Sequence, residues 1–187
     1  DQSDELLTMI KNILEATKVE AKKIKADLDW MSPVSFLNDL RKVYSFSLGK
    51  HLTLDWDYPS NLPLIQSDYE KLKQILHNLI NNALKFTEKG GITVSARYCA
   101  EEQKMEFEVV DTGPGIPHEM VPSIFEMFRQ LDGSETRTYG GMGLGLYIVK
   151  KFTDVLGGDI SVRSEPGKGS AFKVTLPVRE ELNRGSN

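Results

Sequence analysis

Apolar residues recur at alternating steps of four and three along the first part of the chain, with lysines and glutamates between them. This spacing predicts one amphipathic helix over residues 3–23. Its stripe consists of Leu6, Ile10, Ile13, Thr17 and Ile24. A single helix of this length cannot bury such a stripe by itself. We expect it to pack either on a partner helix, as the second half of a helical hairpin, or on its own domain.

Periods of two and of about 3.6 residues alternate through the rest of the chain and predict strands and helices. The expected strands cover residues 24–30, 52–58, 92–98, 105–111, 160–164 and 171–178, and the expected helices cover residues 33–48, 68–86 and 146–156. A glycine-studded stretch over residues 112–145, with one short helix near residues 121–128, is too long to be only a connection. This order of elements predicts a two-layer α/β (α+β) sandwich over a mixed sheet.

Composition narrows the choice of function. The 187 residues carry a net charge of -4, and no basic stripe is visible, so the chain is not expected to bind nucleic acid. The single cysteine, Cys99, excludes an internal disulfide and fits a reducing compartment. No apolar run approaches the roughly 20 residues that span a bilayer. We therefore expect a soluble, cytoplasmic piece without membrane contact, and leave open an anchor elsewhere in a longer parent protein.

The segment NLINNALKF, residues 78–86, concentrates asparagines on a predicted helix. Asn78, Asn82 and Lys85 lie at i, i+4 and i+7 and so share one face. Amide oxygens can ligate magnesium, and a lysine ammonium can pair with phosphate oxygens. The alternative is an ordinary solvated helix face, but asparagine is a poor helix former and its concentration here needs a reason.

The segment DTGPGIP, residues 111–117, directly follows a predicted strand. Alternation places Asp111 on the same side as the apolar residues of that strand, and a buried carboxylate is costly unless it accepts hydrogen bonds. An exocyclic amine of a bound base would be a suitable donor. Gly113 and Gly115 would let the backbone approach a flat ligand closely. The alternative is an ordinary turn at the end of a strand.

Two further segments point to ligand binding. GGMGLGL, residues 140–146, leads into a predicted helix, and glycines before a helix N-terminus can form an anion site. It has neither the Walker nor the dinucleotide-binding spacing, and could be a flexible connector. Ser170 shares the parity of Phe172 and Val174, which turns its hydroxyl inward; otherwise it is a capping serine in a hairpin.

In this order, the four segments resemble the histidine kinase catalytic domain of the Bergerat-fold ATPases, over about residues 25–178. The resemblance implies a Bergerat ATP-binding fold, with a mixed sheet of about five strands packed on three helices, plus an N-terminal helix. Residues 13–23 resemble the end of the second dimerisation helix of such kinases. The implied domains are residues 1–23 from that helix, residues 24–180 as the catalytic domain and residues 181–187 as a tail.

By this resemblance ATP and Mg²⁺ are the cofactors. Asn82 would ligate magnesium, and Asn78 and Lys85 would contact the phosphates. Phe86 would pack near the adenine or ribose, and Asp111 would read the adenine. The remaining implied nucleotide-site residues are Gly113, Gly115, Ile116, Phe125 (in the motif IFEMF), Arg129 near the γ-phosphate, the lid residues Gly141, Gly143, Leu144, Gly145 and Leu146, and Ser170, which would hold a water against the adenine.

The implied reaction transfers the ATP γ-phosphate to a histidine of the dimerisation domain. The chain has His51, His77 and His118, and the stretch from His118 to Pro122 lacks the basic residue of the phosphoacceptor motif. We expect the acceptor to lie upstream of Asp1, so that this chain binds ATP without phosphorylating itself. The implied partners are its own phosphoacceptor domain, a second copy in a full-length homodimer, and the receiver domain of a response regulator.

Three alternatives stay open. Related ATPases of the gyrase, mismatch-repair and heat-shock chaperone types place a glutamate base four residues before the magnesium asparagine, where this chain has Asn78, which cannot abstract a proton. Serine-directed kinases share the same pocket. A non-catalytic nucleotide-binding sensor would also carry every pocket residue named.

Overall fold

The computed structural model describes residues 24–45, 51–128 and 143–178. The helix predicted over residues 3–23 lies outside them. The elements, in chain order, are β1 (Asp29–Met31), α2 (Pro33–Tyr44), β2 (Leu52–Asp57), β3 (Ile65–Ser67), α3 (Tyr69–Phe86), β4 (Gly90–Cys99), β5 (Lys104–Asp111), the 3₁₀ turn η1 (Val121–Ser123), α4 (Gly145–Val155), β6 (Asp159–Glu165) and β7 (Gly169–Pro177).

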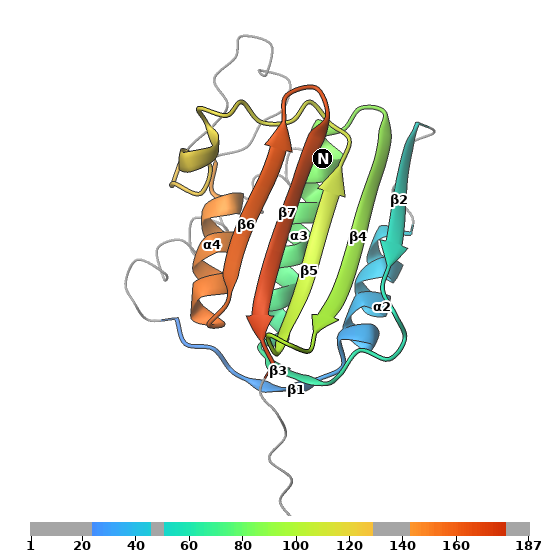
Figure 1. Ribbon diagram of the computed structural model, residues 1–187, viewed down its shortest axis with the longest axis vertical. Coiled ribbons are helices and arrows are strands. Elements are labelled where there is room, and N and C mark those ends of the chain that lie inside the picture. The colour runs from blue at the N-terminus through green and yellow to red at the C-terminus, as the bar shows by residue number, and fades with distance from the viewer. Residues whose placement is uncertain (1–23, 46–50, 129–142, 179–187) are drawn as a thin grey trace, which may run out of the picture.

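The main sheet has five strands in the order β2-β4-β5-β7-β6. β2 pairs parallel with β4, and the other neighbours pair antiparallel. Helices α2, α3 and α4 lie together behind one face of this sheet (Figure 1). The prediction of a two-layer sandwich, with a mixed sheet of about five strands on three helices, is therefore confirmed.

The core lies between the two layers, where the inward-facing residues of the strands pack against those of the helices. On β5, Met105, Phe107 and Val109 point inward and are at most 1% exposed. On α3, six residues at helical spacing form the facing stripe: Leu72, Ile75, Leu76, Leu79, Ile80 and Ala83. Burying a side chain such as Phe107 stabilises the fold by about 2–3 kcal/mol. This packing fixes the polar faces of α3 and β5 relative to each other.

The two helices that follow strands begin at residues suited to capping. Ser32 accepts the N–H of Ser35 at 3.3 Å, and Pro33 occupies the first turn of α2, where no backbone donor is needed. Asp68 accepts the N–H of Lys71 at 3.0 Å and so fixes the start of α3. No helix among the described residues is long and apolar enough to cross a membrane.

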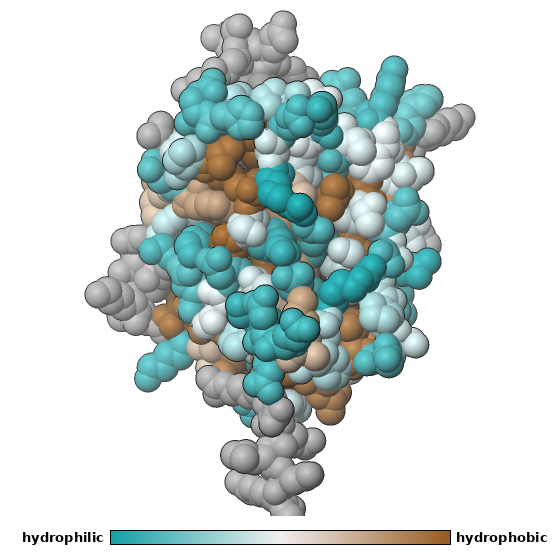
Figure 2. Space-filling model, viewed as in Figure 1, coloured by the Kyte–Doolittle hydropathy of each residue, from teal (hydrophilic) through white to brown (hydrophobic). Residues whose placement is uncertain are grey.

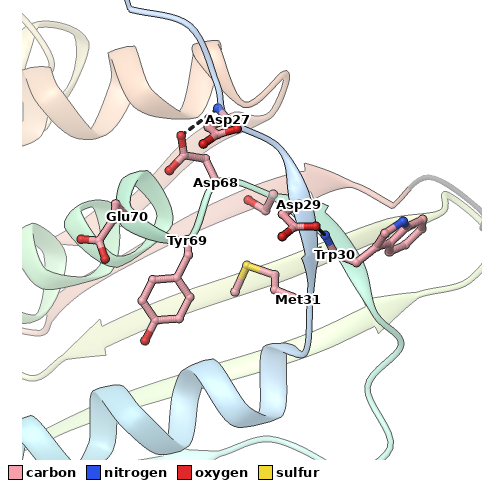
Figure 3. A pocket seen from close by; sticks show the side chains of 8 residues that line it. Asp27, Asp29, Trp30, Met31, Asp68, Tyr69 and Glu70 are labelled. Atoms are coloured by element: carbon pink, nitrogen blue, oxygen red, sulfur yellow. Dashed lines mark hydrogen bonds between the residues drawn. The ribbon is translucent and has the colours of Figure 1, made fainter.

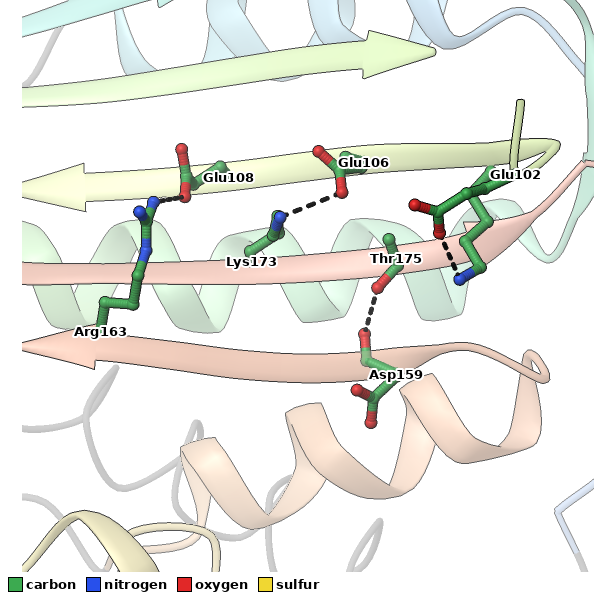
Figure 4. Close-up of polar contacts among 8 residues, drawn as sticks. Glu102, Glu106, Glu108, Asp159, Arg163, Lys173 and Thr175 are labelled. Carbon is green, nitrogen blue, oxygen red and sulfur yellow. Dashed lines mark hydrogen bonds and ion pairs between the residues drawn. The ribbon is translucent and has the colours of Figure 1, made fainter. Parts of the chain in front are cut away.

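The other face of the sheet is polar. Hydrophilic residues spread over the strands in the view that faces it (Figure 2). Cross-strand ion pairs join β6 to β5 through Arg163 and Glu108 at 2.8 Å, and β7 to β5 through Lys173 and Glu106 at 3.0 Å (Figure 4). Such exposed pairs contribute little each, about 0.2–1 kcal/mol. This face does not bury apolar surface, so the sheet has a helical layer on one side only.

Three predicted elements need correction. The strand expected over residues 24–30 is only β1, which pairs antiparallel with β3, a strand that was not predicted. Each has three residues, too short for a period-two pattern to stand out. The helix expected over residues 121–128 is only η1, and the segment ends at Phe128, whose backbone is left-handed, with φ of 62°. Helix α2 ends at Tyr44, and residues 46–50 lie outside the described part of the chain.

Candidate functional site

A row of polar side chains crosses three strands at one end of the main sheet. Asp111 closes β5 and lies opposite Ser170 on β7, which lies opposite Ser164 on β6. Asp111 and Ser170 are buried, at 9% and 7% exposure, and Ser164 is half-buried. The inward direction predicted for Asp111 and Ser170 is confirmed. The row therefore stands on the helix side of the sheet, at the end of its apolar core.

Asp111 keeps its carboxylate in this position through backbone donors. Gly113 N donates to Asp111 Oδ1 at 2.8 Å. Burial raises the pKa of Asp111 above its ordinary value of 3.8, while backbone hydrogen bonds from Gly113 and Ser170 act in the opposite direction. A half-desolvated carboxylate of this kind gains most from a ligand that donates to it, because the donor replaces lost water.

The segment after Asp111 is held against the turn between β6 and β7. Gly167 N donates to Pro114 O at 2.7 Å, and Ile116 N donates to Ser164 Oγ at 2.8 Å. Gly115 has φ of +70°, and a Cβ there would lie 2.2 Å from Glu165 O. Only glycine fits such a contact. The backbone of residues 113–116 is thus a fixed wall beside the carboxylate.

The asparagine face of α3 meets the start of α4. Asn78 and Asn82 are half-buried, and a Cβ on Gly145 would lie 3.3 Å from Asn78 Oδ1 and 3.9 Å from Asn82 Nδ2. Asn78 Nδ2 donates to Gln74 O at 3.0 Å, which turns its amide oxygen away from its own helix. The first residue of α4 therefore sits directly over the two asparagines.

The beginning of α4 is suited to an anion. Its first helical hydrogen bond runs from Ile148 N to Leu144 O at 2.9 Å, and the N-cap residue Leu144 has no polar side chain to offer the preceding N–H groups. The helix dipole adds partial positive charge at this end. Because the asparagine amides lie alongside, this corner of the molecule can surround a phosphate with donors and with oxygen ligands for a cation.

The end of α3 connects the two halves of the site. Lys85 is half-buried in its last turn, with Nζ 5.1 Å from the centre of the Phe86 ring, and Phe86 is 37% exposed. A Cβ on Gly113 would lie 3.2 Å from Phe86 O and 2.9 Å from Asp111 Oδ1. The backbone carbonyl of the exposed Phe86 therefore packs against the turn that follows Asp111.

The structure places the remaining predicted residues as follows. Gly143, Leu144 and Leu146 border the start of α4, with Leu144 buried and Leu146 half-buried. Phe125 is half-buried against the core, between η1 and the end of the described segment. Arg129 and Gly141 lie outside the described residues, so their predicted roles stay predictions.

Two residues of this region were missed from the sequence. Ser164 shares the parity of Ile160 and Val162, which was a usable signal for an inward hydroxyl. Thr87, which follows α3, is 3% exposed, and its hydroxyl has no hydrogen-bond partner among the described residues. It lies 3.0 Å from the position of a Cβ on Gly113. No local pattern marked it, because its burial results from contact with a turn far along the chain.

A hollow lies at the opposite end of α3 from the polar row (Figure 3). Its volume is about 330 Å³. Its lining consists of Asp27, Asp29, Trp30, Met31, Ser67, Asp68, Tyr69 and Glu70. Tyr69 begins α3, so at 1.5 Å per residue the hollow is roughly 20 Å along the helix from Asn82. Four acidic side chains would repel phosphate groups, which makes this hollow unsuitable for a nucleotide.

Comparisons with known proteins agree with this geometry. The sequence profile of the family described as histidine kinase-, DNA gyrase B-, and HSP90-like ATPase matches residues 67–180. The chain is 36% identical to the autoinducer 2 sensor kinase/phosphatase LuxQ of Vibrio parahaemolyticus, over 95% of this chain and 21% of that protein. It is 38% identical to the circadian input-output histidine kinase CikA of Synechococcus elongatus, over 95% of this chain and 24% of that protein.

Solved structures show the same fold. Full-length ShkA in complex with AMPPNP superposes with a TM-score of 0.83 at 32% identity, over 95% of this chain and 36% of that one. The chain spans about a fifth to a quarter of the length of the curated relatives named above. It belongs to the histidine kinase-, DNA gyrase B-, and HSP90-like ATPase family, as a catalytic domain of the histidine kinase kind.

Proposed function

We propose that this chain binds ATP and is the catalytic domain of a sensor histidine kinase. The observation that carries the proposal is the convergence, at one end of the sheet, of a buried carboxylate on β5 with the asparagine face of α3 and the start of α4. A base, a ribose and a chain of phosphates need those surroundings in that order. The relative solved with AMPPNP, at 32% identity, supports the same ligand class.

The base end of the ligand would lie against β5 and β7. Asp111 would accept a hydrogen bond from the exocyclic amine of adenine, and Ser170, its neighbour across the strands, would hold a bridging water. The wall made by Gly113, Gly115 and Ile116 would pack against the flat ring. The Phe86 ring, partly exposed beside this wall, would cover the adenine or the ribose.

The phosphate end would lie between α3 and α4. Asn78, Lys85 and the N–H groups at the start of α4 would contact phosphate oxygens. Asn82 would be a magnesium ligand through its amide oxygen. Among the described residues no group of three or more acidic, histidine or cysteine side chains could hold a metal by itself. This donor set fits Mg²⁺, which usually keeps several waters and binds substrate phosphates, and which would neutralise charge on the transferred group.

The proposed reaction moves the γ-phosphoryl group to a histidine nitrogen of the dimerisation domain. The bond from the γ-phosphorus to the bridging oxygen breaks, a phosphorus–nitrogen bond forms, and ADP leaves. The histidine's proton passes to a base beside that histidine. We further propose residues 1–23 as the end of the second dimerisation helix, residues 24–180 as the catalytic domain, a homodimeric parent, and a response regulator receiver domain as the next phosphate acceptor.

A hydrolase of the gyrase or chaperone type is less well supported. Such an enzyme needs a general base near the magnesium asparagine, and this chain has Asn78 there, with its amide nitrogen bonded to the helix backbone. His77, the neighbouring histidine, is hydrogen-bonded to Tyr44 at 2.6 Å on another side of α3. We therefore expect slow ATP hydrolysis by this chain, which a steady-state phosphate-release assay measures.

Calorimetric titration with MgATP tests the proposal. The wild type is expected to bind in the micromolar range, and Asp111→Asn is expected to weaken binding about 100-fold, because the amide places a second donor opposite the amine. The matched control is Asp27→Asn, in the acidic hollow, which should bind as the wild type does. Equal affinity of Asp111→Asn and wild type would refute the assignment of the adenine pocket.

A further inference from the structure

Ser164 on β6 contacts three groups with one hydroxyl, all of them at the proposed base pocket. Ile116 N donates to Ser164 Oγ at 2.8 Å. Ser164 Oγ lies 2.9 Å from Gly169 O and 2.9 Å from Ser170 Oγ. These contacts join the wall after Asp111, the turn between β6 and β7, and the serine proposed to face the adenine. No ligand role follows for Ser164 itself, because its hydroxyl is fully engaged by the protein.

The direction of each hydrogen bond follows from the donors available. A serine hydroxyl has one hydrogen and two lone pairs. The Ile116 N–H can only donate, so it uses one lone pair of Ser164. The Gly169 carbonyl can only accept, so the single hydrogen of Ser164 points to it. The contact between the two serines must then use the second lone pair of Ser164, and Ser170 is the donor.

This arrangement fixes the chemistry of Ser170. Its one hydrogen is used on Ser164, so its oxygen presents only lone pairs to the pocket. The neighbouring Asp111 carboxylate also presents only acceptors when ionised. Together they form an acceptor-only edge. Such an edge favours a base, or a bridging water, that donates toward it, as the 6-amino group of adenine can and the 6-oxo group of hypoxanthine cannot.

We propose that Ser164 is a positioning residue that selects 6-aminopurine nucleotides by holding Ser170 as an acceptor. The inference rests on the proposed function, since it concerns the same pocket. It adds a cause of specificity that lies outside the ligand's contact surface. Without the Ser164 hydroxyl, the Ser170 hydrogen is free to turn into the pocket, where it can donate to a 6-oxo group, and Ile116 N loses its partner.

The test compares MgATP with MgITP, which differs at the 6-position and the adjacent ring nitrogen, by calorimetry on folded protein. The wild type should prefer ATP. Ser164→Ala should lower ATP affinity about tenfold and shrink the ATP/ITP affinity ratio by a similar factor. Ser164→Thr, which keeps the hydroxyl on a strand that tolerates β-branching, should restore both values. In a Ser170→Ala background, Ser164→Ala should no longer change the ratio.

A purely structural role predicts otherwise: Ser164→Ala would weaken ATP and ITP equally and leave their ratio unchanged, and that result would overturn the proposal. If the alanine variant does not fold, Ser164→Cys, which keeps the shape but is a weak hydrogen-bonding group, must show the same smaller ratio. An unchanged ratio there would overturn it equally. Failure of the wild type to bind MgATP would instead refute the proposed function, before any Ser164 variant is compared.

Discussion

Individual residues at the site hold polar groups in positions that the apo fold does not favour. Asp111 is a largely buried carboxylate whose pKa is raised by that burial. Thr87 is a buried hydroxyl with no partner among the described residues. Asp111 has lost much of its hydration, and an unsatisfied hydroxyl such as that of Thr87 typically costs about 1–3 kcal/mol. A ligand-binding site accounts for the first cost, because a donor on the ligand repays it on binding.

Asp111→Asn is expected to make the apo protein more stable at neutral pH. The folded-state pKa of Asp111 exceeds its ordinary value of 3.8, so the carboxyl stabilises the fold only when protonated, and that contribution is lost as pH rises through the folded pKa. Asparagine avoids this loss. Urea unfolding should show a gain of about 1 kcal/mol over the wild type, while Asp27→Asn stays within about 0.5 kcal/mol. A clear loss of stability in Asp111→Asn would show instead that the ionised carboxylate stabilises the apo fold.

Thr87→Val removes a hydroxyl that has no described partner and keeps the shape of the side chain. We expect thermal unfolding to show unchanged stability or a gain of about 1 kcal/mol. The matched control is Thr153→Val, on α4, because the buried Thr153 hydroxyl donates to Val149 O at 2.7 Å and its loss should destabilise by about 1 kcal/mol. Equal destabilisation in both variants would show that the Thr87 hydroxyl has a partner.

Among the elements, α2 and α3 are joined by a polar contact inside their interface. Tyr44 on α2 donates to Asn81 Oδ1 at 3.0 Å and lies 2.6 Å from His77 Nδ1. Because a phenol has one hydrogen, His77 Nδ1 must be the donor in the second contact. Burial also raises the pKa of Tyr44, which keeps it in the donor form. This network aligns the helix that carries the asparagine face.

Stability should fall on acidification because of His77. Burial, with help from Lys73, lowers its pKa below 6.5, while Glu70 acts weakly in the opposite direction. As the pH falls through 6.5, His77 takes up a proton in the unfolded chain but stays neutral in the folded chain. Folding therefore becomes less favourable until the lower folded pKa is reached. Urea unfolding between about pH 7.5 and 5.5 should show this loss in the wild type and a smaller one in His77→Gln. Identical pH profiles would rule out this role.

The start of β7 lies so close to the end of β5, its antiparallel neighbour, that only glycine fits. Gly169 has φ of +106°, and a Cβ there would lie 1.9 Å from Asp111 O. Gly169→Ala should therefore lower the free energy of unfolding by more than about 3 kcal/mol, since both backbone strain and a clash oppose it. Gly167→Ala is the control: φ is +79° but nothing lies within 4 Å, so about 1–2 kcal/mol is expected. Equal effects would mean that the backbone around Gly169 can move away from Asp111.

At the scale of the molecule, the two ends of the sheet differ in their chemistry. One end carries the polar row that includes Asp111, together with the asparagines of α3 and the start of α4. The other end carries the acidic hollow beside β1 and β3. The outer face of the sheet is polar and carries ion pairs between strands (Figure 4). A polyanionic ligand is thus favoured at the first end and repelled at the second.

Much of this architecture could be predicted from the sequence, because long helices and strands repeat their pattern of apolar and polar residues several times. Helix α3 and the inward direction of Asp111 and Ser170 follow from spacing alone. Short strands such as β3 have too few residues for a period. Contacts between distant segments, such as Ile116 to Ser164, require the register of β6 on β7, which no local pattern gives. The burial of Thr87 could not be predicted for the same reason, since it results from contact with the distant turn at Gly113.

Amide hydrogen exchange of the wild type with and without saturating MgATP tests most directly where the nucleotide binds. We expect slower exchange with MgATP in residues 111–116, 143–148 and 164–170, because the ligand would contact or immobilise the backbone there. Residues 27–31 and 65–70, which border the acidic hollow, should show no change. Protection confined to the hollow, or none in the first three segments despite measured binding, would show that the nucleotide does not bind at the carboxylate and asparagine end of the molecule.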